Sequence, residues 1–476
     1  MVILFVLSSA TSYFNNFLQG KLQFLLYKEV SQSAFNVLQM SSIKNSTTKT
    51  RGDLLTRILG NTQLITNIIT KIFPQFIMAC VSLIFPFFIL LSLNAYLTMI
   101  TISPVLFFIV ISVFMGRKME TIQKKILEIN ALLFQVLNEF IAIIPLIKIF
   151  NLEKWSNKNF KEQMGDYCSS SIKYTKISSI SYFFNAFFMS FPIILFFWQG
   201  SLMVMDGSIS IGTFTAFITY ITMFFSPISQ LSTFYTTYKS TLPAFDRIKE
   251  VFDMLPEKDG NHDLMFNEGE IIFENVFFSY DDKAIIKSFN ATFKRGLNYI
   301  VGDNGSGKST IIKLILRLYH PDKGTIKIDG QDISQLNKKS LINHISTVFS
   351  TPYLFSGTIY DNIKVGDLKA SENDIIHALD LAELTNFINE KPEQYKFNVS
   401  EDGNLLSSGQ KQKMALARAI LKNAPILLLD EATKSVDTHS RESINKIVTK
   451  FKNEKTIIIV THNLEEVEPN SNIIHL

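Results

Sequence analysis

The sequence predicts a two-part protein, in which an all-α helical domain that spans a membrane is followed by an α/β domain. Apolar residues and long runs without charge are concentrated before about residue 238, whereas later in the chain short β-like runs alternate with helical stretches. A glycine-rich loop lies between one of these strands and a helix. With 476 residues the chain is too long for one ordinary domain. We expect the membrane domain at 1–255, a linker at 256–268 and the α/β domain at 269–476.

The membrane domain is predicted from long stretches without charged side chains. The run 72–116 contains none over roughly 45 residues, enough for two spans of about 20 with Asn94 as the turn between them. Three further uncharged runs, 1–20, 177–205 and 207–238, approach or exceed the length of a span, so the sequence predicts about five spans. Buried helices of a soluble core are the alternative, but such cores rarely sustain so many uncharged runs.

Lysine and arginine set the predicted orientation, because positively charged short loops stay in the cytoplasm. The segments 44–57, 117–125 and 148–176 are basic or mixed in charge, while the turns 92–96 and 204–210 contain no Lys or Arg. The α/β domain is therefore expected in the cytoplasm.

Charge and cysteine content exclude several other classes of protein. The formal net charge is +4, but no basic cluster interleaves with aromatic residues, so we expect no nucleic-acid partner. Cys80 lies in a predicted span and Cys168 in a cytoplasmic segment, a spacing that supports neither a disulfide framework nor a zinc site. The first 20 residues could also be a signal peptide, but they lack a basic start and a small-residue cleavage site.

The cytoplasmic segment 117–176 repeats apolar residues at three- and four-residue spacing, which predicts helices that continue out of the membrane. Such arms either contact another surface or form solvated hairpins. In the α/β domain, the apolar runs 298–301 and 426–429 show no alternation. This is typical of strands that are buried on both faces in a largely parallel sheet.

The strongest single signal is the glycine-rich loop, which directly follows a predicted strand and precedes the helical run 311–319. Glycine is needed because the backbone must wrap around phosphate with its N–H groups pointing inward. Lys308 would bring a positive charge to the terminal phosphates, and the Ser309 hydroxyl suits Mg²⁺. An ordinary glycine turn is the alternative, but this pattern rarely arises by chance. The residues expected to bind ATP are Gly302, Asp303, Asn304, Gly305, Ser306, Gly307, Lys308, Ser309 and Thr310.

Two carboxylates, Asp430 and Glu431, follow the predicted strand 426–429, at the end where open α/β sheets bind ligands. Asp430 can hold Mg²⁺ through water, and Glu431 can orient or deprotonate the attacking water. Without other evidence, such a pair of carboxylates would more often lie exposed to solvent at the edge of a sheet. Beside the phosphate loop it predicts a catalytic site.

Two further candidates are weaker when taken alone. His462 follows the apolar run 456–460, and a single histidine is more often structural or exposed than catalytic. Tyr280 is most simply an aromatic residue of a strand, although its ring could stack on adenine.

These motifs together resemble the ABC exporter family over nearly all of the chain. Leu406, Ser407, Ser408, Gly409 and Gln410 resemble the family's signature loop, 399–403 its exporter-specific segment, and Asp437, in 434–437, its loop between two ATP sites. His462 is at the switch-histidine position. In the membrane half, the similar segments are 50–55, 139–150 and 212–217.

The resemblance implies a half-transporter with ATP and Mg²⁺ as cofactors and with Lys308, Glu431 and His462 as catalytic residues. Its partners would be the lipid bilayer, the transported substrate and a second half-transporter, identical or different. Two ATP domains would dimerise head to tail, so that the phosphate loop of one and Ser407–Gln410 of the other enclose each nucleotide. The resemblance places the protein in a bacterial plasma membrane and predicts a short helix at 151–157 that docks on an ATP domain.

The sequence departs from the family in four ways. The first of six usual spans is absent, and the chain stops earlier than usual at Leu476, so both ends look truncated. Ser408 replaces a glycine of the signature loop, and Ser350 replaces a glutamine that reaches the metal and water.

The function that the resemblance implies is ATP-driven export of a lipid, a peptide or an amphipathic small molecule. Two alternatives stay open at this point. One is a weakly hydrolysing, ATP-binding gating half of a heterodimer, which Ser350 favours. The other is an importer that is built like an exporter.

Overall fold

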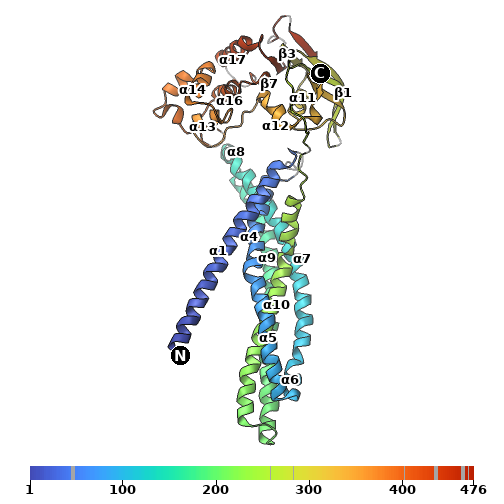
Figure 1. Cartoon of the computed structure of the whole chain (residues 1–476), viewed down its shortest axis with the longest axis vertical. Helices are drawn as coiled ribbons and strands as arrows, with labels where there is room; N and C mark the ends of the chain where they lie inside the picture. The colour runs from blue at the N-terminus through green and yellow to red at the C-terminus, as the bar shows by residue number, and fades with distance from the viewer. Residues whose placement is uncertain are drawn as a thin grey trace. The chain divides into compact units, whose positions relative to one another are not determined.

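The computed structural model describes residues 1–43, 49–257, 259–281, 283–400, 403–433, 438–462, 467–469 and 471–476. They belong to two compact units, Met1–Glu257 and Lys258–Leu476 (Figure 1). Each unit is described separately below.

The first unit is built from long helices. They are α1 (Val2–Met40), α3 (Arg51–Leu55), η1 (Thr56–Asn61), α4 (Thr62–Asn67), η2 (Ile68–Ile72), α5 (Phe73–Leu93), α6 (Ala95–Ile102), α7 (Pro104–Ala142), α8 (Ile144–Ile149), α9 (Glu153–Met205) and α10 (Ile211–Phe252). α7 packs against α9, and α10 packs against both α5 and α7. The stretches η1 and η2 have π-helical hydrogen bonding inside an otherwise α-helical segment.

Four helical segments of the described residues are long and apolar enough to cross a membrane: Arg51–Leu93, Ala95–Ala142, Glu153–Met205 and Ile211–Phe252. The fifth predicted span, residues 1–20, lies in the continuous helix α1. Polar residues such as Asn15 and Asn16 make this stretch less apolar than the four others, and the span stays a prediction. Helices of this length and composition can cross a membrane, because they satisfy their backbone hydrogen bonds within the segment.

The turns between these helices follow local backbone chemistry. The predicted turn at Asn94 is confirmed: its extended backbone separates α5 from α6, and its side chain accepts a 2.9 Å bond from Leu97 N. The helix predicted at 151–157 is wrong in position. α8 precedes it and begins beside Pro145, whereas Asn151 has φ +52° and Glu153 already starts α9. Asparagine tolerates that left-handed backbone, which is why the turn falls there.

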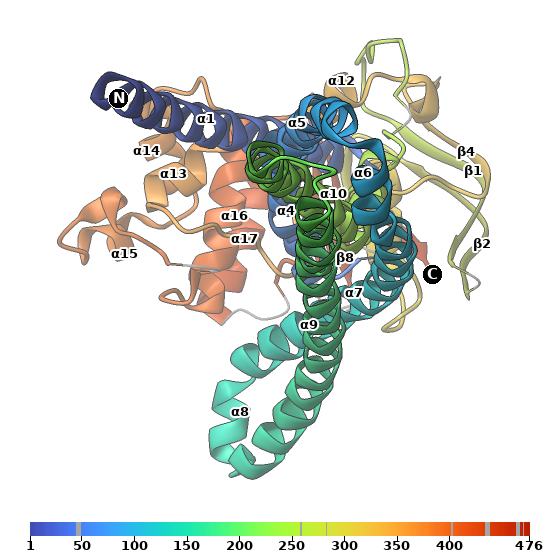
Figure 2. The same cartoon turned by 90° about the horizontal axis from the view of Figure 1, so that it is seen from below.

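The second unit contains two sheets. Its elements are β1 (Ile271–Tyr280), β2 (Lys283–Phe293), β3 (Gly296–Val301), α11 (Lys308–Ile315), β4 (Lys323–Ile328), β5 (Gln331–Asp332), η3 (Ile333–Gln335), α12 (Lys338–Asn343), β6 (Ile345–Val348), α13 (Ile359–Lys364), α14 (Glu372–Leu381), α15 (Thr385–Asn389), η4 (Gln394–Lys396), α16 (Ser408–Lys422), β7 (Ile426–Asp430), α17 (Thr438–Phe451), β8 (Thr456–Thr461) and β9 (Asn472–His475). Figures 1 and 2 show β1 and α13–α14 on opposite sides of this unit.

The larger sheet has the order β6-β7-β8-β3-β9, and its described strands pair in parallel. The two buried strands predicted from uninterrupted apolar runs are confirmed as β3 and β7. The predicted parallel sheet is therefore correct. The second, antiparallel sheet, in the order β2-β1-β4-β5, was not anticipated as a separate layer.

The parallel arrangement positions the candidate site, because the carboxyl ends of β3, β6, β7 and β8 meet at one edge. Val301 pairs with Thr461, and Asp430 pairs with Val460. The loops that leave these strands therefore start side by side.

Candidate functional site

The glycine-rich loop leaves β3 and runs directly into α11, as the sequence predicted. Gly305 and Gly307 have φ of +86° and +105°, a backbone conformation that side chains with a Cβ rarely adopt. Nothing lies within 4 Å of where a Cβ on Gly305 would be. Within the described part of the chain, no acceptor bonds the backbone N–H groups of Gly305, Gly307, Lys308 or Ser309. These groups, at a helix start, are free for an anionic ligand.

Lys308 lies inside this loop and is 5% exposed. Its ammonium donates to the carbonyl oxygens of Gly302 at 2.7 Å and Asp303 at 2.8 Å. An ammonium has three N–H donors, so one remains for a phosphate oxygen. The buried Ser306 Oγ has no hydrogen-bond partner among the described residues, so this loop also holds an unsatisfied hydroxyl. Asn304 and Thr310 lie in the same stretch, and Thr310 N donates to Gly307 O at 2.9 Å.

Ser309 and Asp430 come from different elements and meet at the base of the loop. Ser309 Oγ donates to Asp430 Oδ1 at 2.8 Å. Burial of this carboxyl raises its pKa, and the adjacent Glu431 acts in the same direction, whereas the bond from Ser309 opposes both. A hydroxyl and a carboxylate beside a phosphate loop are the oxygen ligands that Mg²⁺ prefers. This pair of donors therefore fits a magnesium ion.

Glu431 directly follows β7 and has φ of +47°, so its backbone turns away from the strand. Its N–H donates to Val460 O at 3.1 Å, which ties it to the neighbouring strand β8. Its Oε1 lies 3.9 Å from His462 Nδ1, with side-chain exposures of 13% and 45% respectively. The two predicted catalytic residues are thus neighbours at the carboxyl edge, with the carboxylate the more buried.

Ser350 lies just after β6, and its carbonyl oxygen accepts a 2.7 Å hydrogen bond from Gln412 Nε2. Since Val348 pairs with Leu429, the chain that leaves β6 is level with Asp430 in the next strand. The position where the family has a glutamine therefore lies at the same sheet edge as the Ser309–Asp430 pair.

The predicted signature loop forms the start of α16. Ser407 Oγ accepts from Gln410 N at 3.2 Å, and Gln410 Oε1 accepts from Ser407 N at 2.9 Å, a reciprocal capping box. Ser408 is the first helical residue and Gly409 is buried. Among the described residues, this capping box forms no hydrogen bond with the phosphate loop of the same chain. That the signature loop acts on the nucleotide of a second chain stays a prediction.

Tyr280 ends β1 and packs edge to face against Phe278 and Tyr319, with centroids 4.8 and 5.1 Å away. The Lys313 ammonium lies 5.8 Å from its ring centroid. Stacking of this ring on adenine stays a prediction. Asp437 and the rest of 434–437 lie outside the described residues, as do Glu401 and Asp402 of the predicted exporter-specific segment.

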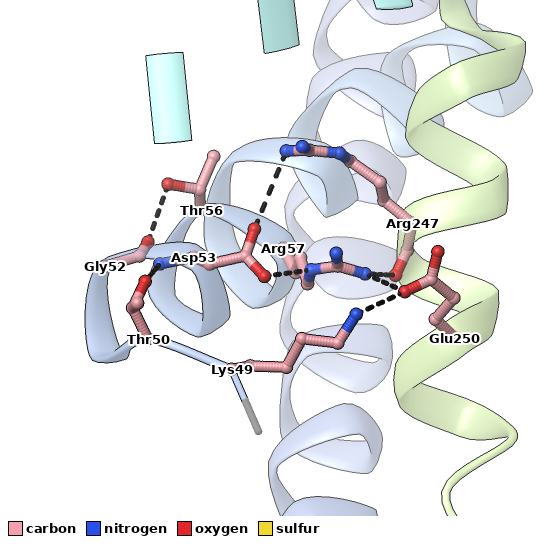
Figure 3. Close-up of polar contacts among 8 residues, drawn as sticks. All are labelled: Lys49, Thr50, Gly52, Asp53, Thr56, Arg57, Arg247 and Glu250. Atoms are coloured by element: carbon pink, nitrogen blue, oxygen red, sulfur yellow. Dashed lines mark hydrogen bonds and ion pairs between the residues drawn. The ribbon is translucent and has the colours of Figure 1, made fainter. Parts of the chain in front are cut away.

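A charged cluster in the membrane unit includes the predicted segment 50–55 (Figure 3). Arg57, 5% exposed, donates to Asp53 at 2.7 Å, to Glu250 at 2.8 Å and to the Arg247 carbonyl at 3.0 Å. Lys49 also bonds Glu250, at 2.7 Å. The cluster connects the start of the first described span with the last turns of α10.

Sequence reasoning missed residues that act through distant contacts. Gln412 and Arg418 both lie on α16 and hold the chain that follows β6: Gln412 bonds the carbonyls of Phe349 and Ser350, and Arg418 bonds the carbonyl of Tyr353. Burial lowers the pKa of Arg418 to about 10. The available signal was that Gln412 lies on the same helix face as the apolar Leu416 and Ala419, four and seven positions later.

Comparisons with known proteins agree with this arrangement. A family model described as "ABC transporter transmembrane region" matches residues 1–228, and one described as "ABC transporter" matches residues 286–434. An uncharacterised ABC transporter ATP-binding protein of Bacillus subtilis, YknV, is 31% identical over 468 residues, covering 95% of this chain and 76% of the relative. An ATP-dependent lipid A-core flippase of Syntrophus aciditrophicus is 27% identical, covering 100% and 80%.

Among solved structures, a bacterial Atm1-family ABC exporter with ATP bound superposes with a TM-score of 0.89 at 24% identity. The match covers 97% of this chain and 82% of the other. At that identity the likeness establishes the fold: a helical membrane domain joined to an α/β nucleotide-binding domain.

Proposed function

This chain belongs to the ABC transporter family and is an ATP-hydrolysing exporter, and we propose that it works as half of a dimer in which each ATP site is shared. The observation that carries the ATP-hydrolysing site is the Ser309–Asp430 bond of 2.8 Å at the base of a phosphate loop in which, among the described residues, the N–H groups of Gly305, Gly307, Lys308 and Ser309 have no acceptor. It brings residues 121 positions apart to one sheet edge.

The residues at this edge divide the work of phosphoryl transfer. Lys308, already oriented by two carbonyls, neutralises charge on the terminal phosphates, together with the loop N–H groups. Glu431 would orient and deprotonate the attacking water, and the neighbouring His462, one residue after β8, would contact the terminal phosphate. Ser309 and Asp430 would hold Mg²⁺. That ion would neutralise the charge that develops between the β- and γ-phosphates.

The second half of each site comes from another chain. Ser407–Gln410 begins a helix of its own, and its capping box does not bond the phosphate loop of the same chain among the described residues. A second half-transporter, identical or different, would therefore supply its signature loop, and Asp437 would lie in the segment that connects the two sites. We place the dimer in a bacterial plasma membrane with its ATP domains in the cytoplasm, as the basic cytoplasmic loops predict.

We propose that the cargo is a lipid, a peptide or an amphipathic small molecule. One relative is named for lipid A-core flipping and another, ComA of Streptococcus pneumoniae, for transport and processing. An apolar cavity of about 340 Å³ lies between α5, α7 and α10. Its serines, Ser112 and Ser232, bond each other at 3.0 Å, so the lining offers little polar recognition. Such a lining suits a hydrocarbon portion of the cargo.

Exporter-type relatives favour outward transport over the importer and the gating half that the sequence left open. The test is ATP-dependent uptake into inverted vesicles that contain the full chain, assayed with a panel of lipids, peptides and amphipathic dyes. We expect uptake of one class, stimulation of ATPase activity by that class, and loss of both in Lys308→Ala. ATP hydrolysis with no uptake of any class by inverted vesicles, but with ATP-dependent release of preloaded cargo from them, would reverse the direction.

A further inference from the structure

Gln412 is a glutamine buried in the interior of the ATP domain. It lies on α16, one turn after Gly409 of the signature loop, and is 2% exposed. Its Nε2 donates to two backbone carbonyls, Phe349 O at 3.2 Å and Ser350 O at 2.7 Å. Both N–H groups of the carboxamide are therefore used on one short piece of chain, 62 residues away in sequence.

The carboxamide oxygen of Gln412 shows which contacts determine the orientation of the side chain. Gln412 Oε1 is buried and has no hydrogen-bond partner among the described residues. A buried unpaired acceptor is unfavourable. The opposite orientation of the carboxamide would be still less favourable, because it would place Oε1 against the two backbone carbonyl oxygens. The two bonds to Phe349 and Ser350 therefore determine how the side chain lies.

The chain held by Gln412 is close to the hydrolytic residues. β6 pairs in parallel with β7, and Val348 is opposite Leu429, so Phe349 is level with Asp430, which bonds Ser309. Ser350 follows by one residue. The Ser350 side chain is short, so the path of the backbone at this residue determines where its hydroxyl lies.

The other end of the connection is the signature loop. Ser407 caps α16, and Gln412 follows five positions later on the same rigid helix. Farther along the helix, Arg418 holds the carbonyl of Tyr353, but that contact is beyond Ser350. Gln412 thus links the first turns of α16 to the chain at Ser350 through hydrogen bonds between described residues.

We propose that Gln412 is a positioning residue for ATP hydrolysis: its carboxamide holds the Phe349–Ser350 backbone level with Asp430 and links it to the helix that the signature loop begins. The proposal rests on the proposed ATPase function. When the partner's nucleotide engages the signature loop, a shift of α16 moves the Ser350 backbone through these two hydrogen bonds. Gln412 itself does not touch the nucleotide.

The test uses Gln412→Met, which keeps the length and removes both donors, and Gln412→Glu, which keeps the shape and places oxygens against the carbonyls. The exposed Gln394→Glu is the matched control. Each variant of the full chain, reconstituted in lipid, is assayed for ATP turnover, for ATP affinity measured with EDTA present, and for thermal unfolding. Each substitution is then combined with Ser350→Gln.

We expect Gln412→Met to lower turnover about tenfold, with ATP affinity changed by less than about twofold. Gln412→Glu should lower turnover further, and Gln394→Glu should match the parent. The effect of Ser350→Gln on turnover should differ between the parent and the Gln412→Met variant, because coupled residues are not additive. If Gln412→Met does not fold, Gln412→Glu and its double variant decide.

Three results would overturn the proposal. They are turnover within about twofold of the parent in a folded Gln412 variant, loss of ATP affinity in proportion to turnover, or an unchanged effect of Ser350→Gln. An inactive parent protein would count instead against the proposed ATPase function, so the two failures are distinguishable.

Discussion

Arg57 and Glu250 are 193 residues apart in sequence, yet the guanidinium of one bonds the carboxylate of the other at 2.8 Å (Figure 3). Arg57 is buried, and it also bonds Asp53, whose side chain is 14% exposed, whereas the Glu250 side chain is 53% exposed. The buried part of this cluster is therefore the Arg57–Asp53 pair. Glu250 connects that pair to the end of α10.

Removing Arg57 should destabilise the membrane unit more than removing the charge of Glu250. We expect Arg57→Ala to cost about 3 kcal/mol, because it leaves the buried Asp53 carboxylate without its main partner. Glu250→Gln should cost less than about 1 kcal/mol, because water screens an exposed carboxylate. Unfolding midpoints of the purified protein in detergent measure both. Lys148→Ala, which breaks the exposed pair with Glu153, is the control, and a larger effect there than at Arg57 would contradict this account.

Lys308 and Glu431 should act at different steps. Lys308→Ala should weaken ATP binding and stop turnover, because it removes the positive charge of the phosphate loop. Glu431→Gln should keep ATP binding, lower turnover by about 10²-fold or more, and trap a closed dimer. Nucleotide affinity, steady-state turnover and size-exclusion chromatography with ATP check these outcomes. Near-normal turnover in Glu431→Gln would show that another group activates the water.

Asp430 should reduce stability while it serves the site. Its native pKa is raised by burial, so the protonated form is favoured in the folded state. The contribution of the protonated Asp430 carboxyl to the free energy of unfolding is fully present below the unfolded-state pKa of about 3.9. It is lost as the pH rises through the native pKa, because the buried carboxyl must then ionise. Asp430→Asn should therefore raise the unfolding midpoint in EDTA at pH 7.5 and much less at about pH 4.5, while abolishing Mg²⁺-dependent turnover. A variant less stable than the parent at pH 7.5 would refute the argument.

Ser350 should limit the rate of hydrolysis. Its hydroxyl could reach a metal or the attacking water only through another water, which weakens positioning more than binding. Ser350→Gln should raise turnover about tenfold, equivalent to about 1.4 kcal/mol, with little change in ATP affinity. Single-turnover kinetics of the assembled dimer measure this. An unchanged or lower rate would indicate that Ser350 suits pairing with a different half.

The elements and site residues that could be predicted were those with local sequence signals. The phosphate loop, β3 and β7 each show their pattern within about ten residues, and the parallel sheet then explains why Ser309 meets Asp430. Local patterns contain no information on partners far along the chain. Gln412 with Ser350, and Arg57 with Glu250, became visible only in three dimensions. The misplaced helix at 151–157 is a smaller error, since the resemblance indicates that a short helix exists at the end of the arm but not at which residue it begins.

The helical segment Arg51–Leu93, which enters the first described span, contains the regular helices α4 and α5 between and after the π-helical stretches η1 and η2. Each residue of an α-helix turns its successor by about 100°, so removing one residue from α4 would rotate all of α5 relative to Arg57. The apolar face that α5 packs on α10 would then turn away from it, although no side chain there had changed. In related sequences we therefore expect gaps and insertions to avoid α4 and α5 and to gather in the turn at 206–210, where a change of length leaves the phase of the packed helices unchanged.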